Sequence, residues 1–354
     1  MLLTVIVFLL ILSVLVLVHE LGHFLAAKKF GIYVEEFGFG LPPRLIGKKI
    51  GETIYSINWL PFGGFVKLYG EEGEDAKAKK SIKKDRAFYT RPVWQRVIVI
   101  AAGVAMNFVL ALVVISYIFT QGVMVPTNRV HIEKIIEGSP ADIAGLAKGD
   151  IILEIENTSI TKTEDLINTT KKYLGKEITL VILRNAKEER ISLTPRQDFP
   201  ADQGPMGVSI SSFEEKKYAW NEAPVEGLKQ SIVLTNELVK GIGKTLWKLI
   251  TFQNVSKDVA GPIGIAQMTG EAIKFGRNAV LEMLGLLSLN LAIINILPFP
   301  ALDGGRLLFV VIEGITGKRV KTNWERYIHQ AGMAILLLLI VLVTVNDLVR
   351  IFRK

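Results

Sequence analysis

Residues 2–27 read LLTVIVFLLILSVLVLVHELGHFLAA, and this stretch decides the fold class. Residues 2–18 are apolar apart from Thr4 and Ser13, and the apolar character resumes at Phe24. As a helix the stretch would be roughly 39 Å long, which exceeds the bilayer core of about 30 Å. A secretory signal peptide would carry a basic start and a small-residue cleavage site, and neither flanks this run. We therefore expect an uncleaved transmembrane helix.

The composition of the 354-residue chain agrees with a membrane protein. Hydrophobic residues make up 50% and charged residues 21%, which argues against both disorder and an ordinary soluble globule. The chain has no cysteine, so thiolate metal sites, disulfides and cysteine nucleophiles are excluded. The net charge of +8 indicates basic loops beside a bilayer rather than binding of nucleic acid. Histidine chemistry is limited to His19, His23, His131 and His329.

Four apolar segments are predicted to cross the membrane, so the fold class is a polytopic α-helical membrane protein. The predicted spans are residues 1–28, 93–120, 278–300 and 327–349. Lysine and arginine are concentrated in the connections 29–92 and 301–326, which places both in the cytoplasm. The basic tail at 350–354 argues for the opposite orientation but is outnumbered. The long segment between the second and third spans is therefore expected outside the cytoplasm.

Residues 127–200 are predicted to form a compact α+β domain in this extracytoplasmic segment. Alternating apolar residues predict strands, and Gly138-Ser139-Pro140 predicts a turn with a helix cap. The run GSPA at 138–141, followed by AGL at 144–146 and GDII at 149–152, resembles bacterial PDZ domains. An unrelated small α/β domain is the alternative.

The remaining soluble segments carry weaker patterns. In residues 29–92 we expect short strands at 54–57 and 65–68 around the apolar turn WLPFGG, a cytoplasmic-side hairpin associated with the membrane. The mixed charge run at 71–86 is expected to be a solvated loop. Residues 215–277 predict amphipathic or juxtamembrane helices, which would lie on the outer membrane surface or pack against the PDZ-like domain.

Residues 19–23 read HELGH, an H-E-x-x-H motif near the end of the first span. On a helix, positions i and i+4 share a face, so His19 and His23 can bind one metal ion. Zinc suits nitrogen and carboxylate ligands where cysteine is lacking. Glu20 is placed to take a proton from water at the metal. The alternative is a packed polar pair with a structural role, but ionisable groups inside a membrane need partners.

A catalytic zinc site needs a third protein ligand. His131 lies in the predicted outer domain, whereas His329, near the start of the fourth span, is a candidate. Residues 295–305 read NILPFPALDGG, in which the prolines should break the third helix and Gly304-Gly305 permits a tight turn. Asp303 would then lie at the cytoplasmic end of the third span, at the depth of the histidine pair. We therefore predict Asp303 as the third ligand, with an ordinary Asp-Gly turn as the alternative.

Together these motifs resemble the site-2 protease family of intramembrane zinc metalloproteases, in its bacterial branch with one PDZ domain between the second and third spans. One family element departs from the pattern, because Val104 stands where G-P-x-x-N-F has proline, although Asn107 is retained. A helix kink there is therefore in doubt. The resemblance covers nearly the whole chain and rests on HELGHF at 19–24, GGFVK at 63–67, the PDZ-like segment, GPIG at 261–264 and residues 295–305.

The resemblance implies regulated intramembrane proteolysis, a zinc-dependent hydrolysis of a peptide bond in another protein's transmembrane segment. It implies a multi-pass protein of the bacterial cytoplasmic membrane, whose partners are single-span membrane proteins first cut by another protease. Anti-sigma factors and remnant signal peptides are substrates of this type. It also implies that Asn295 helps to hold the substrate, and that the hairpin around Gly63, Gly64 and Phe65 pairs with it as an extended strand. A hydrogen bond to a neighbouring helix is the alternative role for Asn295.

Two other classes of function were compared with the protease. A catalytically idle membrane scaffold could bind protein tails through the PDZ-like domain, but the intact set His19, Glu20, His23 and Asp303 argues against it. A transporter also uses broken helices, yet four spans without an evident inverted repeat do not fit that class. Since the membrane separates the PDZ-like domain from the chemistry, we expect it to filter substrates, with docking of substrate tails as the alternative.

Overall fold

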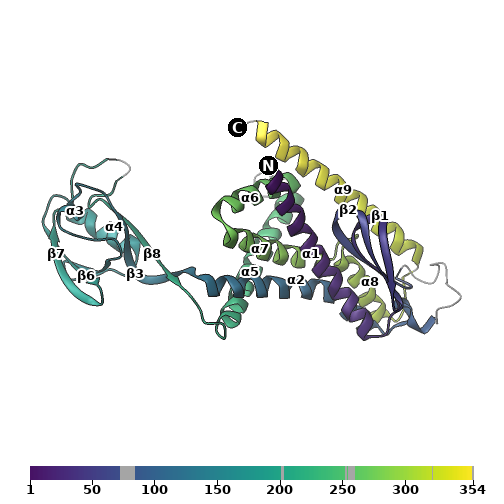
Figure 1. Ribbon diagram of the computed structural model, residues 1–354. Helices are drawn as coiled ribbons and strands as arrows, with labels where there is room; N and C mark the ends of the chain where they lie inside the picture. The colour runs from purple at the N-terminus through teal and green to yellow at the C-terminus, as the bar shows by residue number, and fades with distance from the viewer. Residues whose placement is uncertain (72–83, 201–202, 252, 254–259, 321, 353–354) are drawn as a thin grey trace. The chain divides into compact units, whose positions relative to one another are not determined.

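The computed structural model of the chain describes residues 1–71, 84–200, 203–251, 253, 260–320 and 322–352 (Figure 1). These residues form two compact units. The first, called the membrane unit, contains residues 1–118 and 220–354, and the second, called the inserted unit, contains residues 119–219. Most of the predicted solvated loop at 71–86 lies outside the described residues.

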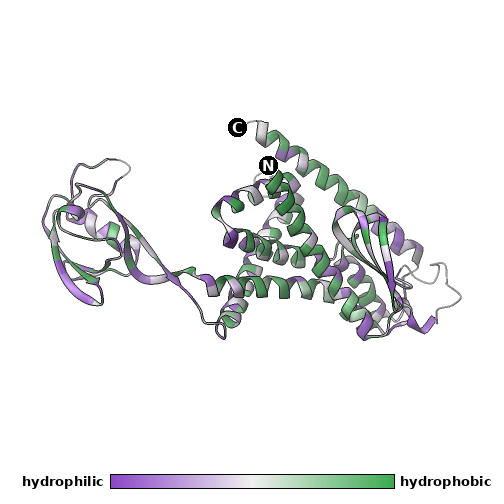
Figure 2. Ribbon diagram, viewed as in Figure 1, coloured by the Kyte–Doolittle hydropathy of each residue, from purple (hydrophilic) through white to green (hydrophobic). Residues whose placement is uncertain are grey.

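Among the described residues, four helices are long and apolar enough to cross a membrane, in agreement with the four predicted spans. They are α1 (Leu2–Lys29), α2 (Val93–Gln121), α7 (Arg277–Ile296) and α9 (Thr322–Phe352). Their most apolar windows are only 11% to 39% buried inside the protein. Figure 2 shows the apolar residues running along α1, α2 and α9. Helices that expose so much apolar surface are typical of a lipid environment.

The membrane unit also contains three further helices and two short 3-10 turns among the described residues. They are α5 (Ala223–Ile250), α6 (Pro262–Phe275), α8 (Asp303–Thr316) and the 3-10 turns η1 (Lys84–Arg86) and η2 (Phe88–Thr90). The first two lie in the region predicted as amphipathic or juxtamembrane helices. Helix α8 corrects the sequence prediction, in which residues 301–326 form a loop. Val310 of α8 is buried and Leu307 packs beside it, so an apolar face stabilises this helix despite its Gly-Gly start.

The hairpin is larger than the sequence predicts. β1 (Val34–Ile50) and β2 (Thr53–Leu68) pair with each other, and the turn between them lies at Gly51-Glu52. Both strands bend, so that Phe37 pairs with Tyr55 on one side and with Val66 on the other. The residues between 57 and 65, predicted as a turn, belong to the continuous β2.

A buried charge explains why β1 escapes prediction. Glu36 is only 9% exposed and lies on the buried face of the strand with Val34, Gly38 and Gly40. Its carboxylate accepts hydrogen bonds from Arg44 and from Ser56, which satisfy it inside the sheet. Glutamate is usually exposed, so a glutamate at a buried position breaks the alternation of apolar and polar residues by which a strand is predicted.

A buried apolar cluster joins the end of α1 to the sheet, α2 and α8. A partly buried ion pair adds to it, because both Nη atoms of Arg96 on α2 donate to the carboxylate of Glu313 on α8, at 2.9 and 2.6 Å. These contacts hold the sheet, α2 and α8 against the end of α1 that carries the H-E-x-x-H motif. The cluster consists of Ala27, Ile32, Val34, Leu68, Phe88, Val99, Ile100 and Val310.

The inserted unit is an α+β domain built on a six-stranded sheet of order β7-β6-β4-β3-β8, with β5 paired to β4. Ser139 caps the first helix by accepting a hydrogen bond from the Asp142 amide, as the sequence predicts. The sheet extends beyond the expected limits of 127–200, because β8 pairs along β3 as far as Val123. The elements are β3 (Val123–Ile135), α3 (Pro140–Ile143), β4 (Ile151–Ile155), β5 (Thr158–Ser159), α4 (Thr163–Lys172), β6 (Ile178–Arg184), β7 (Lys187–Leu193) and β8 (Val208–Lys216).

Candidate metal centre and active site

The structure brings His19, His23 and Asp303 together inside the membrane unit. The two histidines lie one turn apart on α1 and are 6% and 8% exposed. The Nε2 atoms of His19 and His23 lie 2.8 and 3.1 Å from Oδ2 of Asp303, and 3.1 Å from each other. Three donor atoms from two segments that are far apart in sequence therefore converge on one point.

This triangle of donor atoms fits a zinc ion. Zinc binds imidazole nitrogen and carboxylate oxygen at about 2.0–2.2 Å, so tetrahedral ligands lie about 3.3 Å from one another. The observed separations of 2.8 to 3.1 Å are close to that spacing. Three protein ligands also leave a fourth position open, as catalytic zinc sites require.

Helix α2 orients both imidazole rings through their Nδ1 atoms. Nδ1 of His23 donates to the carbonyl of Val99 at 2.8 Å. Nδ1 of His19 contacts the amide side chain of Asn107 at 3.2 Å, and that residue is fully buried. The Asn107 atom at this distance is Nδ2, a donor, and its Oδ1 is buried without a hydrogen-bond partner among the described residues. With Nε2 of His19 turned to the ligand point, Nδ1 carries the proton, and turning the Asn107 amide over by 180° places Oδ1 as the acceptor. Ser288 of α7 donates to the backbone carbonyl of Asn107 at 2.8 Å, so a third helix contacts α2 at this point.

Gly103 allows α2 to approach the histidines. A Cβ atom there would lie 2.4 Å from Nε2 of His23 and 2.8 Å from Cε1 of His19. No side chain larger than hydrogen fits this space while both rings stay in place. The helix runs without interruption past Val104, the position where the family pattern has proline.

We expect Gly103→Ala to weaken zinc binding by about 10- to 100-fold, the range seen when the support of metal ligands is removed. The added methyl would displace one or both imidazoles from the shared ligand point. Chelator competition on the purified protein measures this affinity. Gly241→Ala on α5, where nothing lies within 4 Å of the new methyl, is the matched control and should leave zinc affinity unchanged. Unaltered affinity in the Gly103 variant would show that the space is not limiting.

Glu20 lies on the sheet side of the metal position. Its Oε2 accepts a hydrogen bond from the backbone amide of Val66 at 2.9 Å. A cavity of about 230 Å³ opens beside it, lined by Glu20, His23, Phe65 and Asp303 among others. The carboxylate is therefore held next to the ligands, with space for a substrate on one side.

The predicted substrate-binding residues have different positions. Asn295 of α7 lies at the centre, since its Nδ2 is 3.4 Å from Nε2 of His19. Gly64 and Phe65 also lie there, because Phe65 lines the cavity and a Cβ at Gly64 would be 3.8 Å from Cγ of Glu20. Gly63 does not line that cavity, and its nearest neighbour is the side chain of Leu41. The last part of β2 thus lies along α1 beside the motif.

The turn that carries Asp303 differs in one respect from the expectation. α7 ends at Ile296, before the prolines, as predicted. Gly304 and Gly305, predicted to form a tight turn, instead belong to the first turn of α8. Cβ atoms there would lie 2.1 Å from the carbonyl oxygen of Leu297 and 2.4 Å from that of Phe299. The glycines are needed because the helix packs directly on the preceding backbone.

The other two histidines are not ligands of this centre. His131 lies in β3 of the inserted unit. His329 of α9 accepts a hydrogen bond from the Ala301 amide at 3.0 Å. Within the described residues, the group of side chains arranged to hold a metal consists of His19, His23 and Asp303.

Comparisons with known proteins agree with this centre. The model of the family described as Peptidase family M50 matches residues 7–339. An inferred zinc metalloprotease of Clostridium perfringens is 37% identical over 341 residues, covering 95% of this chain and 96% of its own. The regulator of sigma-W protease RasP of Bacillus subtilis and the zinc metalloprotease RasP of Bacillus licheniformis are each 31% identical, covering 99% of both chains.

The chain is also similar in part to solved structures. The PDZ domain of the SdrC-like protein from Listeria monocytogenes aligns with 25% of this chain and 93% of its own, at 19% identity and a TM-score of 0.22. A TM-score of that size does not establish a shared fold, so the PDZ assignment of the inserted unit stays a prediction.

Proposed function

Because the chain belongs to Peptidase family M50 and is a zinc metalloprotease, we propose that it cleaves the transmembrane segments of single-span membrane proteins. The observation that carries this proposal is the convergence of His19, His23, Asp303 and Glu20 on helices of the membrane unit. A zinc site enclosed by helices suited to lipid would act on a peptide that is itself within the membrane.

In this proposal His19, His23 and Asp303 hold zinc, and Glu20 is the general base. Bound zinc would act as a Lewis acid and lower the pKa of water. Glu20 would accept a proton from the attacking water as the new carbon–oxygen bond forms. It would then give that proton to the leaving nitrogen as the carbon–nitrogen bond breaks. The amide of Val66 keeps the carboxylate of Glu20 oriented during both transfers.

A transmembrane helix must unwind before it can be cut, because its carbonyl groups are engaged in hydrogen bonds. We propose that the end of β2, with Gly64 and Phe65, pairs with the unwound segment as an added strand. This edge lies along α1 and reaches Glu20 through Val66, so a paired peptide would pass the metal centre. Asn295, 3.4 Å from Nε2 of His19, is positioned to hold the scissile peptide group.

The basic connections between the spans support a proposed orientation in the membrane. Lysine and arginine are concentrated in 29–92, which follows His19 and His23 on α1, and in 301–326, which contains Asp303. We propose that the active site faces the cytoplasm and that the inserted unit lies outside. Anti-sigma factors and remnant signal peptides, already trimmed by another protease, are the proposed substrates. This agrees with the name of the Bacillus subtilis relative, regulator of sigma-W protease.

Reconstitution tests the proposal. Purified protein is placed in liposomes with a single-span substrate whose extracytoplasmic portion has been removed. Cleavage should stop on chelation and return on addition of zinc. A preparation that cuts equally well after full removal of zinc would refute the zinc mechanism.

The inserted unit is proposed to act as a filter. We expect that replacing residues 123–216 by a flexible linker preserves cleavage of a trimmed substrate and increases cleavage of one that keeps its bulky outer portion. The reason is that the unit is inserted in the sequence between two spans, and the proposed topology puts it on the opposite side of the membrane from the metal centre. Initial rates on the two substrates measure the effect. A replacement variant that folds, retains zinc and loses cleavage of the trimmed substrate would support docking instead.

A further inference from the structure

The turn between α7 and α8 positions Asp303. It covers residues 297–302, and no side chain caps the first turn of α8. Within the turn, the backbone amides of Phe299 and Leu302 donate to the carbonyls of Leu297 and Phe299, at 2.7 and 3.2 Å. Ala301 has a φ of 76°, in the left-handed region that residues other than glycine rarely adopt. A turn in this conformation persists only when the surrounding structure holds it in place.

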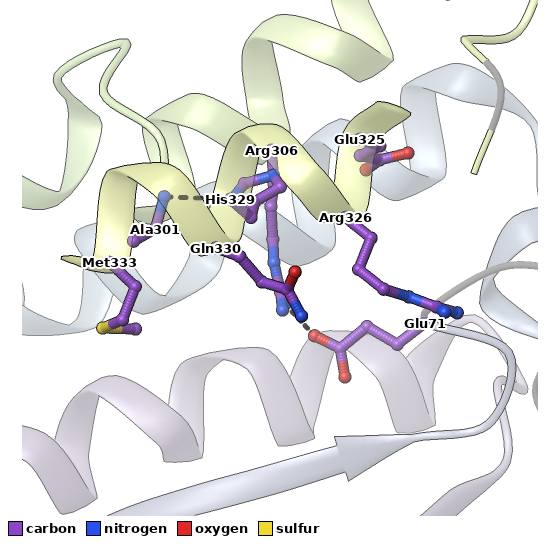
Figure 3. Close-up of a pocket in the computed structure, with 8 residues that line it drawn as sticks. All are labelled: Glu71, Ala301, Arg306, Glu325, Arg326, His329, Gln330 and Met333. Atoms are coloured by element: carbon purple, nitrogen blue, oxygen red, sulfur yellow. Dashed lines mark hydrogen bonds and ion pairs between the residues drawn. The ribbon is translucent and has the colours of Figure 1, made fainter. Parts of the chain in front are cut away.

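Helix α9 supplies that support at two positions one turn apart. The backbone amide of Ala301 donates to Nδ1 of His329 at 3.0 Å, as Figure 3 shows. Three residues further on, a Cβ at Gly332 would lie 2.3 Å from Cβ of Pro300, so the α9 backbone rests directly on the turn. Positions i and i+3 lie on one face of a helix, so both contacts belong to one surface.

The ring of His329 lies against a side chain of α8. Its centroid lies 5.6 Å from that of Phe309 on α8. Its Nε2 is buried and has no hydrogen-bond partner among the described residues. Since Nδ1 is the acceptor, Nε2 carries the proton of the neutral ring. The cavity of about 640 Å³ in Figure 3 lies beside this histidine, and Ala301 and Arg306 also line it.

We propose that His329 is a positioning residue for the metal site: by accepting from the Ala301 amide, it holds the turn that presents Asp303 to zinc. This inference rests on the proposed role of Asp303 as a ligand. Asp303 is two residues beyond Ala301 and begins α8, so displacement of the turn moves the carboxylate away from His19 and His23. The histidine acts through the turn, while its own ring stays outside the ligand set.

Zinc affinity and the cobalt spectrum of purified full-length protein test this role. His329→Leu removes the acceptor and should weaken zinc binding by about 10- to 100-fold. It should also change the visible absorption of the Co²⁺-loaded protein, because the carboxylate ligand is displaced. His329→Asn places an amide oxygen near the position of Nδ1 and should restore both readouts to nearly the wild-type values. Gln330→Leu, on the same cavity, is the matched control and should change neither.

Gly332→Ala provides an independent variant if His329→Leu fails to fold. Its methyl would push α9 away from Pro300, and it should lower zinc affinity and alter the cobalt spectrum in the same way. Wild-type affinity and spectrum in a folded His329→Leu or Gly332→Ala protein would overturn the proposal. So would a His329→Asn protein as defective as His329→Leu. Absence of zinc binding in the wild type would instead refute the metal centre itself, so the two failures are distinguishable.

Discussion

Glu20→Gln should lower the turnover number by about 100- to 10,000-fold, the contribution of a general base. The zinc content and the fold should be unchanged. Glutamine has the same shape as glutamate, and its amide oxygen can still accept from the Val66 amide, which now bonds Glu20 at 2.9 Å. It cannot accept a proton from water at neutral pH. Initial rates on a reconstituted substrate, with zinc measured on the same sample, check both parts.

The control is Glu237→Gln, the same change at an exposed position on α5, and it should keep full activity. If Glu20→Gln retains activity within about tenfold of the wild type, Glu20 is not the general base. Loss of zinc together with activity would point instead to a structural role for the carboxylate.

The His19→Ala, His23→Ala double variant should lose essentially all bound zinc and all activity. Both Nε2 atoms lie within 3.1 Å of Oδ2 of Asp303, and a single carboxylate does not retain zinc against a chelator. Elemental analysis should give about one zinc per chain in the wild type. His131→Ala, in the inserted unit, should keep this content. A double variant with nearly full zinc would place the metal elsewhere.

The parts of the site that follow from local spacing could be predicted from the sequence. His19 and His23 share a helix face because they are four residues apart, and the four apolar segments are visible as hydropathy alone. Asp303 is not local, but the proline break and the topology placed it at the depth of the histidines. All three are brought together in the structure.

The supporting contacts could not be predicted, because they join residues far apart in the chain. Asn107 is 88 positions from His19, and the carbonyl of Val99 that orients His23 leaves no trace in side-chain patterns. An asparagine inside an apolar span was the available signal for the first of these. In the sequence Gly103 is an ordinary small residue of an apolar helix. Its importance follows only from the structure, where an added Cβ would overlap the imidazoles.

The hairpin and α8 escaped prediction for a related reason. Glu36 is buried in β1 only because Arg44 and Ser56 satisfy its carboxylate, and this cannot be inferred from alternation. The Gly-Gly pair at the start of α8 reads as a turn, whereas the structure uses it for close packing on Leu297 and Phe299. In both cases tertiary contacts override the local preference.

The position of the cut bond tests the account most directly. A single-span substrate with a trimmed outer end is incubated in liposomes with wild-type protein or Glu20→Gln, and mass spectrometry identifies the products. The account predicts one or a few cuts inside the apolar segment, produced by the wild type with zinc and nearly missing with Glu20→Gln. Cuts confined to the soluble flanks, or equal cutting by Glu20→Gln, would contradict it.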